Sequence, residues 1–312
     1  LARRWCDARL LFDIRGLLAE EYEEAGVWTK DSPQYRAVRA VERAGLRRAA
    51  QLIVLTRRLR DHLVERGLAR AEQIEVVPCC VDFARFESAR DEGDAKRAVN
   101  ETDAAARGSD DAAVGRFEVV TAGSVTGLYL LEEMGRFFLA LKRQRPDAFL
   151  RVLTTSSATD AAATLVRVGL RSEDFWIGAV KPSEVPAYLK RARLGLSFRK
   201  ATFSQIAASP TKIPEYLAAG LPTVCNAGIG DTDDILTRER VGVIVPNFDA
   251  ETLDEAARAA LVLADETDVR ARAVETAHRY FDLARVGGVG YRNAYRRLAG
   301  DGAGAFVIPE TT

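Results

Sequence analysis

Two residues that suit a phosphorylated, hydroxylated ligand lie three positions apart, Lys212 and Glu215. They follow Ser209-Pro210, an N-cap and first-turn pair that predicts the start of a helix, and Gly220 closes that helix. The free amides of a helix start and the Lys212 ammonium attract an anion, and a carboxylate one turn later can accept both hydroxyls of a ribose. The segment therefore indicates a nucleotide site. The alternative is a capped helix in which Glu215 only favours the dipole.

Further polar groups follow the apolar runs of the same half of the chain. A glycine loop comes after the run 117–122, two cations come after the run 194–198, and a second glycine loop follows 223–225. Glycine lets backbone amides approach a pyrophosphate, and cations neutralise it. The candidate ligand-binding residues are Gly123, Ser124, Arg199, Lys200, Ser209, Thr211, Lys212, Glu215 and Gly230.

The elements that must position these residues alternate between strands and helices. Apolar runs predict strands at 117–122, 149–154, 174–177, 194–198, 223–225 and 242–245. Amphipathic patterns predict helices between them, and two long helices at 250–264 and 268–281 to cover the sheet. This is the pattern of a doubly wound α/β domain, in which ligands bind at the carboxyl ends of the strands.

The first part of the chain predicts half of another such domain. Strands are expected at 10–14, 52–55 and 74–77, with helices at 33–50 and 57–66 and an acidic loop before the first helix. Asp13 and Arg15 lie at the carboxyl end of the first strand, where open α/β sheets place ligands.

The predicted domain organisation has four parts. Residues 1–87 form a partial first domain, 88–115 a polar, flexible linker, 116–300 a complete second domain and 301–312 a tail. The chain begins at Leu1 and its one methionine is Met134, and the apolar run 10–12 already has the character of an interior strand. We therefore expect an amino-terminal part to precede this sequence.

The composition excludes several classes of protein. The 312 residues are 47% hydrophobic, enough for about two cores, and 45 Lys and Arg balance 45 Asp and Glu, which argues against a nucleic-acid-binding protein held by bulk charge. The four cysteines match no zinc spacing and indicate reduced thiols of a cytoplasmic protein. No apolar run approaches the ~18 residues of a membrane span, so any membrane contact is expected to be peripheral, at the inner face.

A local excess of positive charge lies in the first domain. Between Arg36 and Arg70, ten arginines face three acids, Glu42, Asp61 and Glu65. Two interpretations stay open: a solvated helix face, or a surface for anionic lipid headgroups or a phosphorylated acceptor.

Four stretches together resemble a known family. They are SPTKIPEYLAAGLPTVCNAGIGD, GSVTGLYLLEEM, FDIRG and IEVVPCCVD, and they are similar to the retaining glycosyltransferases of the GT-B fold, family GT4 (glycosyl transferases group 1). The resemblance implies two Rossmann-like domains, the first incomplete here. It implies a nucleotide-diphosphate sugar as co-substrate on the second domain, a glycan or lipid-linked saccharide as acceptor, and a role in polysaccharide biosynthesis, with no other cofactor and no metal.

The resemblance also implies roles for particular residues. The second glutamate of the family's E-x7-E pattern contacts the ribose and corresponds to Glu215, whereas the first would fall at Ala207. Ser124 and Leu128 stand where many members carry Arg and Lys for the diphosphate, so we assign this role to Lys212, the Gly123-Ser124 backbone and Arg199 or Lys200. Asp13 and Arg15, facing the cleft, and Lys212 are the expected catalytic residues. Positive groups at the departing diphosphate lower the barrier of a retaining, metal-independent transfer.

Two other functions stay open. A nucleotide-sugar 2-epimerase has the same architecture, although the Ser-Gly-Gly segment of that family is absent at Ala208-Ser209-Pro210. A nucleotide-sugar-binding protein without catalysis is favoured by Ala207.

Overall fold

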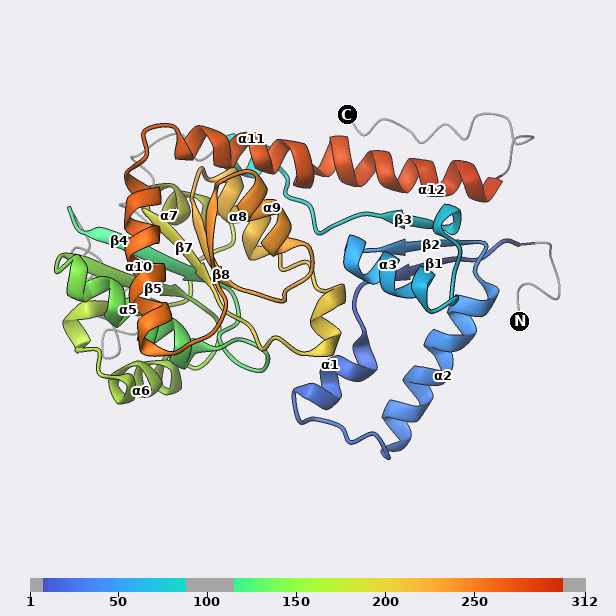
Figure 1. Cartoon of the computed structure of the whole chain (residues 1–312), viewed down its shortest axis with the longest axis horizontal. Coiled ribbons are helices and arrows are strands. Elements are labelled where there is room, and N and C mark those ends of the chain that lie inside the picture. Colours follow the sequence, from blue (N-terminus) through green and yellow to red (C-terminus); the bar gives the residue numbers. More distant parts are fainter. Residues whose placement is uncertain (1–7, 88–114, 300–312) are drawn as a thin grey trace.

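The computed structural model describes residues 8–87 and 115–299. Two parallel β-sheets lie side by side with helices around them, and one pair of consecutive helices runs along both (Figure 1). Residues 88–114 of the predicted linker and the predicted tail, 301–312, lie outside the described residues. Within the described part of the chain, no helix combines the length and the apolar character needed to cross a bilayer.

The first sheet has three parallel strands in the order β1-β2-β3. The strands are β1 (Leu11–Ile14), β2 (Gln51–Val54) and β3 (Ile74–Val76). The helical elements are α1 (Leu18–Glu24), α2 (Pro33–Arg48), α3 (Arg57–Glu65) and η2 (Ala71–Gln73). Thr56 caps α3 by accepting a hydrogen bond from the Leu59 amide. The acidic segment before α2 was predicted to be a loop, and this prediction is wrong. The segment forms helix α1, in which Ala19 is completely buried.

The second sheet has six parallel strands in the order β6-β5-β4-β7-β8-β9. The strands are β4 (Phe117–Ala122), β5 (Ala148–Leu153), β6 (Phe175–Gly178), β7 (Leu194–Ser197), β8 (Thr223–Asn226) and β9 (Gly242–Val245). The helical elements are α4 (Ala84–Glu87), α5 (Leu131–Gln144), α6 (Ala158–Val168), η6 (Ser172–Asp174), α7 (Val185–Arg191), η7 (Phe203–Ala207), α8 (Lys212–Ala218), α9 (Thr232–Arg238), α10 (Ala250–Asp265) and α11 (Val269–Phe281). Every predicted strand of this sheet is present.

Apolar side chains on both faces of the second sheet explain its continuous hydrophobic strands. One core cluster joins the sheet to α5, α6 and α10, and another joins it to α7, α8, α9 and α11. Val119 and Val120, consecutive in β4, are both fully buried, one in each cluster. Burial on both faces is typical of parallel sheets and leaves the strand ends as the places for polar chemistry.

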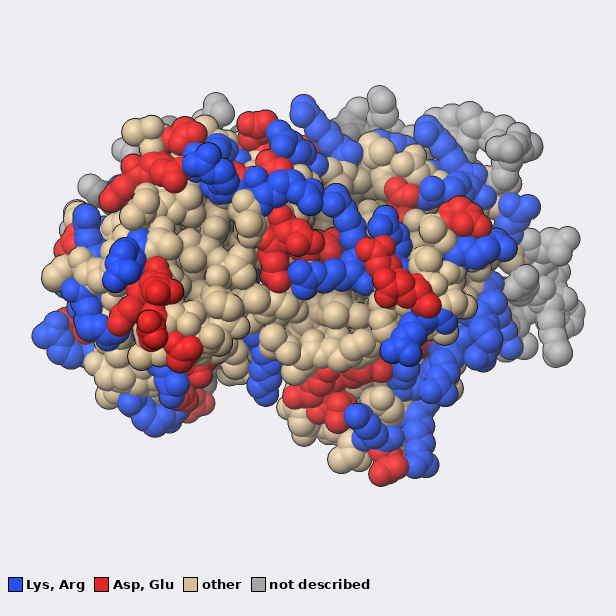
Figure 2. Space-filling view, viewed as in Figure 1, with Lys and Arg blue, Asp and Glu red and all other residues tan. Residues whose placement is uncertain are grey.

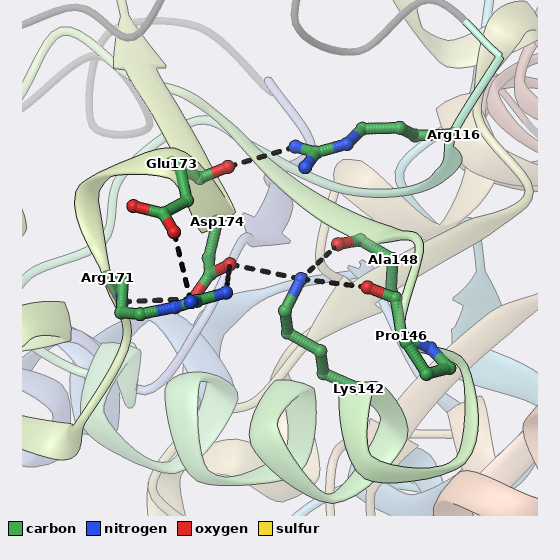
Figure 3. A network of polar contacts seen from close by, with 7 residues as sticks. All are labelled: Arg116, Lys142, Pro146, Ala148, Arg171, Glu173 and Asp174. Carbon is green, nitrogen blue, oxygen red and sulfur yellow. Dashed lines mark hydrogen bonds and ion pairs between the residues drawn. The ribbon is translucent and has the colours of Figure 1, made fainter.

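Ion pairs and hydrogen bonds close the amino ends of these strands (Figure 3). The Lys142 ammonium lies 3.0 Å from Asp174 Oδ1 and donates to the Ala148 carbonyl at 2.9 Å. Arg116 donates to the Glu173 carbonyl at 2.9 Å. These contacts fix the loops at the amino edge of the sheet.

The end of the described chain returns to the first sheet. After α11 comes a short π-helix, η8 (Leu283–Gly288), and then α12 (Val289–Ala299), which lies along the first sheet in Figure 1. Ala294 of α12 is fully buried and packs with Ile53 and Val77. The predicted second domain, 116–300, thus contains a helix whose packing partners belong to the first sheet, which sequence spacing did not indicate.

Candidate active site

The carboxyl edge of the second sheet places several polar loops around one point. The neighbouring strands β4 and β7 lie at the centre of the sheet, and the connections leave them toward opposite sides. This switch point opens a crevice outside the strand ends. The loop after β4 carries Gly123 and Ser124, and the segment after β7 carries Arg199.

Lys212 lies in this crevice as an almost completely buried cation. Lys212 is 3% exposed, and its Nζ donates to the Ser124 carbonyl at 2.9 Å. The ammonium also lies 3.7 Å from the centroid of the Tyr129 ring, a cation–π contact. Burial, and secondarily the positive charge of Arg199, lowers the pKa of Lys212 to about 7. An anion bound beside Lys212 would therefore favour its protonated, charged form.

Hydrogen bonds hold the Arg199 side chain at Tyr129, the residue that also contacts Lys212. Arg199 Nη1 donates to the Tyr129 hydroxyl at 3.0 Å, and its Nε donates to Gln205 Oε1 at 2.8 Å. The backbone amide of Arg199 donates to Asn226 Oδ1 at 2.7 Å. Tyr129 thus contacts both cations, and Gln205, which is fully buried, fixes the direction of the guanidinium.

Glu215 stands on the other side of the crevice, one turn into α8. Its Oε1 lies 3.2 Å from Arg85 Nη1, and Arg85 Nη2 donates to the Pro182 carbonyl at 3.3 Å. Burial raises the pKa of the Glu215 carboxyl, and Arg85 opposes that rise. An acceptor-only carboxylate in this position suits a ligand with hydroxyl groups.

Lys212, Tyr129, Glu215 and Arg85 border a cavity of about 300 Å³. It is lined by Arg85, Ala122, Gly123, Ser124, Tyr129, Leu153, Thr154, Thr155, Ala179, Val180, Pro182, Val185, Thr211, Lys212 and Glu215. One end is cationic, one side is acidic and the rest is largely apolar, which fits a ligand that has a phosphate, hydroxyls and a flat apolar group. We call this space the strand-edge pocket.

The structure corrects the predicted start of the central helix. α8 begins at Lys212, and its N-cap is Thr211, which makes no side-chain capping bond. Ser209, predicted as the N-cap, instead accepts a hydrogen bond from the Cys79 amide at 3.0 Å. Pro214 supplies no amide hydrogen within the seven-residue helix, so the helix start offers less to an anion than predicted, and Lys212 and the Gly123-Ser124 loop carry more of the site.

The other predicted binding residues divide into two groups. Gly123, Ser124, Thr211, Lys212 and Glu215 line the strand-edge pocket.

The other four do not line this pocket, although Arg199 donates to the pocket residue Tyr129. Ser209 lines a second cavity, of about 220 Å³, between the two sheets. Lys200 is placed by its backbone amide, which donates to the Leu128 carbonyl at 2.8 Å. Gly230 has φ +49° and packs so tightly that a Cβ would collide with the Ala208 carbonyl, so its role in this structure is close packing.

Asp13 and Arg15 lie at the end of β1, as predicted, but they contact α12. The Tyr291 hydroxyl donates to Asp13 Oδ2 at 2.6 Å, and Arg15 Nε lies 3.8 Å from the same oxygen. Burial, followed by the hydrogen bond to Asp13, raises the pKa of Tyr291 to about 12. Asp13 Oδ1 is buried and has no hydrogen-bond partner among the described residues.

Carboxylates of α1 reach the second half of the chain. Glu24 accepts hydrogen bonds from the Thr202 hydroxyl at 2.6 Å and from the amide and hydroxyl of Ser204. Burial raises the pKa of Glu21, one turn earlier, and the charge of Arg199 opposes that rise. Both residues were predicted to lie in a loop.

Sequence reasoning missed Arg85 and Tyr129 as pocket residues. Tyr129 stands seven positions after the predicted strand end, inside a segment that was assigned to a helix, and Arg85 lies before the second sheet begins. The one available signal was that Tyr129 follows the glycine loop, because residues in loops at a strand end face the crevice.

Comparisons with known proteins agree with this fold. A family model described as a glycosyl transferase 4-like domain matches residues 1–80. The comparison with curated proteins finds no significant match.

Solved structures extend the likeness to most of the chain. A sucrose-phosphate synthase from Thermosynechococcus elongatus has 18% identity and a TM-score of 0.63, covering 94% of this chain and 70% of that one. HepE from Anabaena, in complex with UDP and glucose, has 12% identity and a TM-score of 0.64, covering 94% and 73%. WaaG, a glycosyltransferase involved in lipopolysaccharide biosynthesis, has 19% identity and a TM-score of 0.62, covering 91% and 73%. At these identities the likeness establishes the fold.

Proposed function

We propose that this chain, which has the GT-B glycosyltransferase fold and a glycosyl transferase 4-like domain in residues 1–80, transfers a sugar from a nucleotide-diphosphate sugar to an acceptor with retention. The observation that carries the proposal is the strand-edge pocket, in which a buried ammonium, Lys212, and a carboxylate, Glu215, face the same cavity. The similar HepE was solved with UDP and glucose, which supports UDP as a probe of this pocket.

In this proposal, the diphosphate lies against Lys212 and the backbone of Gly123 and Ser124. Arg199, whose Nη1 donates to the Tyr129 hydroxyl at 3.0 Å, adds positive charge beside the pocket. The bond between the anomeric carbon and the diphosphate oxygen breaks, the acceptor hydroxyl oxygen bonds to that carbon on the same face, and the hydroxyl proton passes to the departing diphosphate. These preorganised cations stabilise the negative charge that develops on the diphosphate, without a metal ion. Glu215 accepts the ribose hydroxyls at the other end of the pocket.

Two variants test the assignment of the pocket ends. Lys212→Ala should weaken UDP binding by about tenfold or more and leave uridine binding within about twofold, because a buried charge-assisted hydrogen bond is lost only by the diphosphate. Glu215→Ala should weaken both ligands alike. Isothermal titration calorimetry measures the four affinities, and equal losses of UDP and uridine in Lys212→Ala would contradict the phosphate role.

A binding protein without catalysis is the second candidate, and one position favours it. Ala207, where the family's first glutamate would stand, is fully buried and packs in the core cluster of the first sheet. It therefore offers no carboxylate to the donor sugar. Incubation with labelled UDP-glucose and a lipid-linked saccharide separates the candidates: transfer supports the first, isomerisation of the donor supports an epimerase, and binding without turnover supports the second.

The acceptor is proposed to be a glycan or lipid-linked saccharide, reached by peripheral contact with an anionic membrane. α2 buries none of its residues and exposes Val41 by 65%, and Figure 2 shows Lys and Arg gathered over this helix. Within the described residues, the side chains of Arg43 and Arg47 on this surface have no hydrogen-bond or ion-pair partner. Such a surface suits anionic headgroups at about 1 kcal/mol per cation.

Vesicle flotation tests this contact. The protein should float with phosphatidylglycerol vesicles and not with phosphatidylcholine vesicles, and Arg43→Glu with Arg47→Glu should abolish flotation. Arg167→Glu, on α6, is the control. If the protein ignores both kinds of vesicle, α2 is an ordinary solvated helix.

A further inference from the structure

Arg85 lines the strand-edge pocket from α4, before the second sheet begins. It bridges two walls of the pocket, since Nη1 lies 3.2 Å from Glu215 Oε1 and Nη2 lies 3.3 Å from the Pro182 carbonyl. The contact uses one carboxylate oxygen. Oε2 of Glu215 has no hydrogen-bond partner within the described residues, so it remains able to accept from a ligand.

The position of Arg85 is fixed by packing rather than by the ion pair alone. The neighbouring Phe86 is 4% exposed and belongs to the core cluster that contains Ile213 and Tyr216 of α8. The Lys190 ammonium, on α7, donates to the Phe86 carbonyl. α4 is therefore attached to the same body as Glu215, and the guanidinium is held where a ligand would meet it.

We propose that Arg85 is a positioning residue of the donor site, which orients the Glu215 carboxylate and holds it as an acceptor for the ribose hydroxyls. The proposal rests on the proposed function, because it requires a ribose at Glu215. The role adds to the pocket a residue from the segment that links the two sheets.

Electrostatics support this role. Burial raises the pKa of Glu215, and the Arg85 charge and hydrogen bond act in the opposite direction. Among the described residues, Arg85 is the charged group that lowers the pKa of this carboxyl. Lys212, one turn earlier on α8, points to the Ser124 carbonyl instead. Without Arg85, the carboxyl would take up a proton at a higher pH and lose acceptor capacity.

The test measures nucleoside binding as a function of pH. Calorimetry first identifies which of UDP, GDP and ADP the wild-type protein binds most tightly, and the matching nucleoside is then titrated at pH 8.0 and pH 5.5. Arg85→Ala should weaken the nucleoside about fivefold at pH 8.0, the scale of a partly exposed ion pair, and by at least this factor at pH 5.5, because loss of the Arg85 charge favours the protonated carboxyl. Arg85→Lys should recover most of the affinity at both pH values.

Arg143→Ala is the matched control, because it removes an exposed ion pair, 2.6 Å to Asp254, outside the pocket lining. This variant should bind the nucleoside as the wild type does. Nucleoside binding by Arg85→Ala that is unchanged or tighter, or an affinity that Arg85→Lys does not recover, would overturn the role of Arg85 and leave the proposed function standing. A wild-type protein that binds none of the three diphosphates would overturn the proposed function, and the role of Arg85 with it.

Discussion

Lys212 combines a cost in stability with a capacity to bind anions. Its ammonium is buried beside a second cation, Arg199, and this environment lowers its pKa from 10.5 to about 7. A diphosphate would remove the penalty by supplying the missing negative charge. The residue therefore links ligand binding, protonation and folding stability.

The affinity for UDP is predicted to fall as the pH rises above about 7. Above this pH Lys212 is increasingly neutral in the free protein, so binding of the diphosphate must be accompanied by proton uptake. Between pH 7.5 and pH 8.5 the affinity should fall about eightfold. Calorimetry in two buffers of different ionisation enthalpy measures the proton uptake, and uridine should show neither effect. A pH-independent affinity for UDP would exclude Lys212 as its partner.

The same shift predicts how Lys212 affects unfolding. The folded-state pKa is about 7 and the unfolded value 10.5, so the penalty is fully present below pH 7 and disappears as the pH rises through 10.5. Lys212→Met should therefore raise the free energy of unfolding by on the order of a few kcal/mol at pH 6 and by much less at pH 10. Urea unfolding at the two pH values measures the difference, and a loss of stability at both would refute the prediction.

Sequence reasoning found the residues of the pocket that belong to strand ends and missed those supplied by packing. Lys212, Glu215, Gly123 and Ser124 follow from a helix start and a glycine loop near apolar runs, which are local patterns. Arg85 reaches the pocket only because Phe86 is buried against α8, a contact across more than a hundred residues that no local pattern encodes.

At the scale of elements, α8 is fixed to the strands that surround the pocket. The Tyr216 hydroxyl accepts from the Ala122 amide, at the end of β4, at 2.9 Å. Its ring packs so closely on β7 that a Cβ at Gly195 would collide with it. Glu215 precedes Tyr216, so the packing of the ring fixes the helical turn from which the Glu215 side chain projects.

Tyr216→Phe is predicted to destabilise the protein by about 1 to 3 kcal/mol, because the buried Ala122 amide loses its acceptor. Urea unfolding gives the value. Tyr295→Phe, at a residue that is 49% exposed on α12, is the control and should change little. Equal effects of the two variants would show that the hydroxyl at 216 contributes nothing specific.

The sequence predicted the positions of the strands better than the contacts that join one element to another. The six strands of the second sheet were recovered because each is a continuous apolar run between turn signals. The start of α8 was misplaced because Ser209 has a tertiary partner, the Cys79 amide, that competes with capping. α1 was missed because its four glutamates read as a loop, whereas Glu24 is satisfied by Ser204 of the other half of the chain.

At the scale of the whole molecule, short polar contacts join the two sheets. Glu24 holds Thr202 and Ser204, and the Asp231 carboxylate accepts from the Arg57 and Arg58 amides at the start of α3, at 2.7 and 3.2 Å. Carboxylates at such amide groups are stabilising, and they hold the two halves in one arrangement.

A variant that combines Glu24→Ala with Asp231→Ala should open this arrangement. Small-angle X-ray scattering is expected to show a larger radius of gyration than that of the wild type, while UDP affinity stays within about twofold because neither residue lines the strand-edge pocket. Glu23→Ala removes a contact within the first half, 4.0 Å to Lys30, and should leave the radius unchanged. An unaltered radius in the double variant would mean that the remaining contacts between the halves, such as the hydrogen bond from the Cys79 amide to Ser209, are sufficient to fix the arrangement.

The return of α12 to the first sheet has a consequence for synthesis on the ribosome. Ile53 and Val77 are translated early, but Ala294, which covers them, emerges more than two hundred residues later. During that interval one surface of a three-stranded sheet stays apolar and uncovered, a condition that invites chaperone binding or premature association with other nascent chains. Truncation before residue 289 should reproduce that immature state permanently.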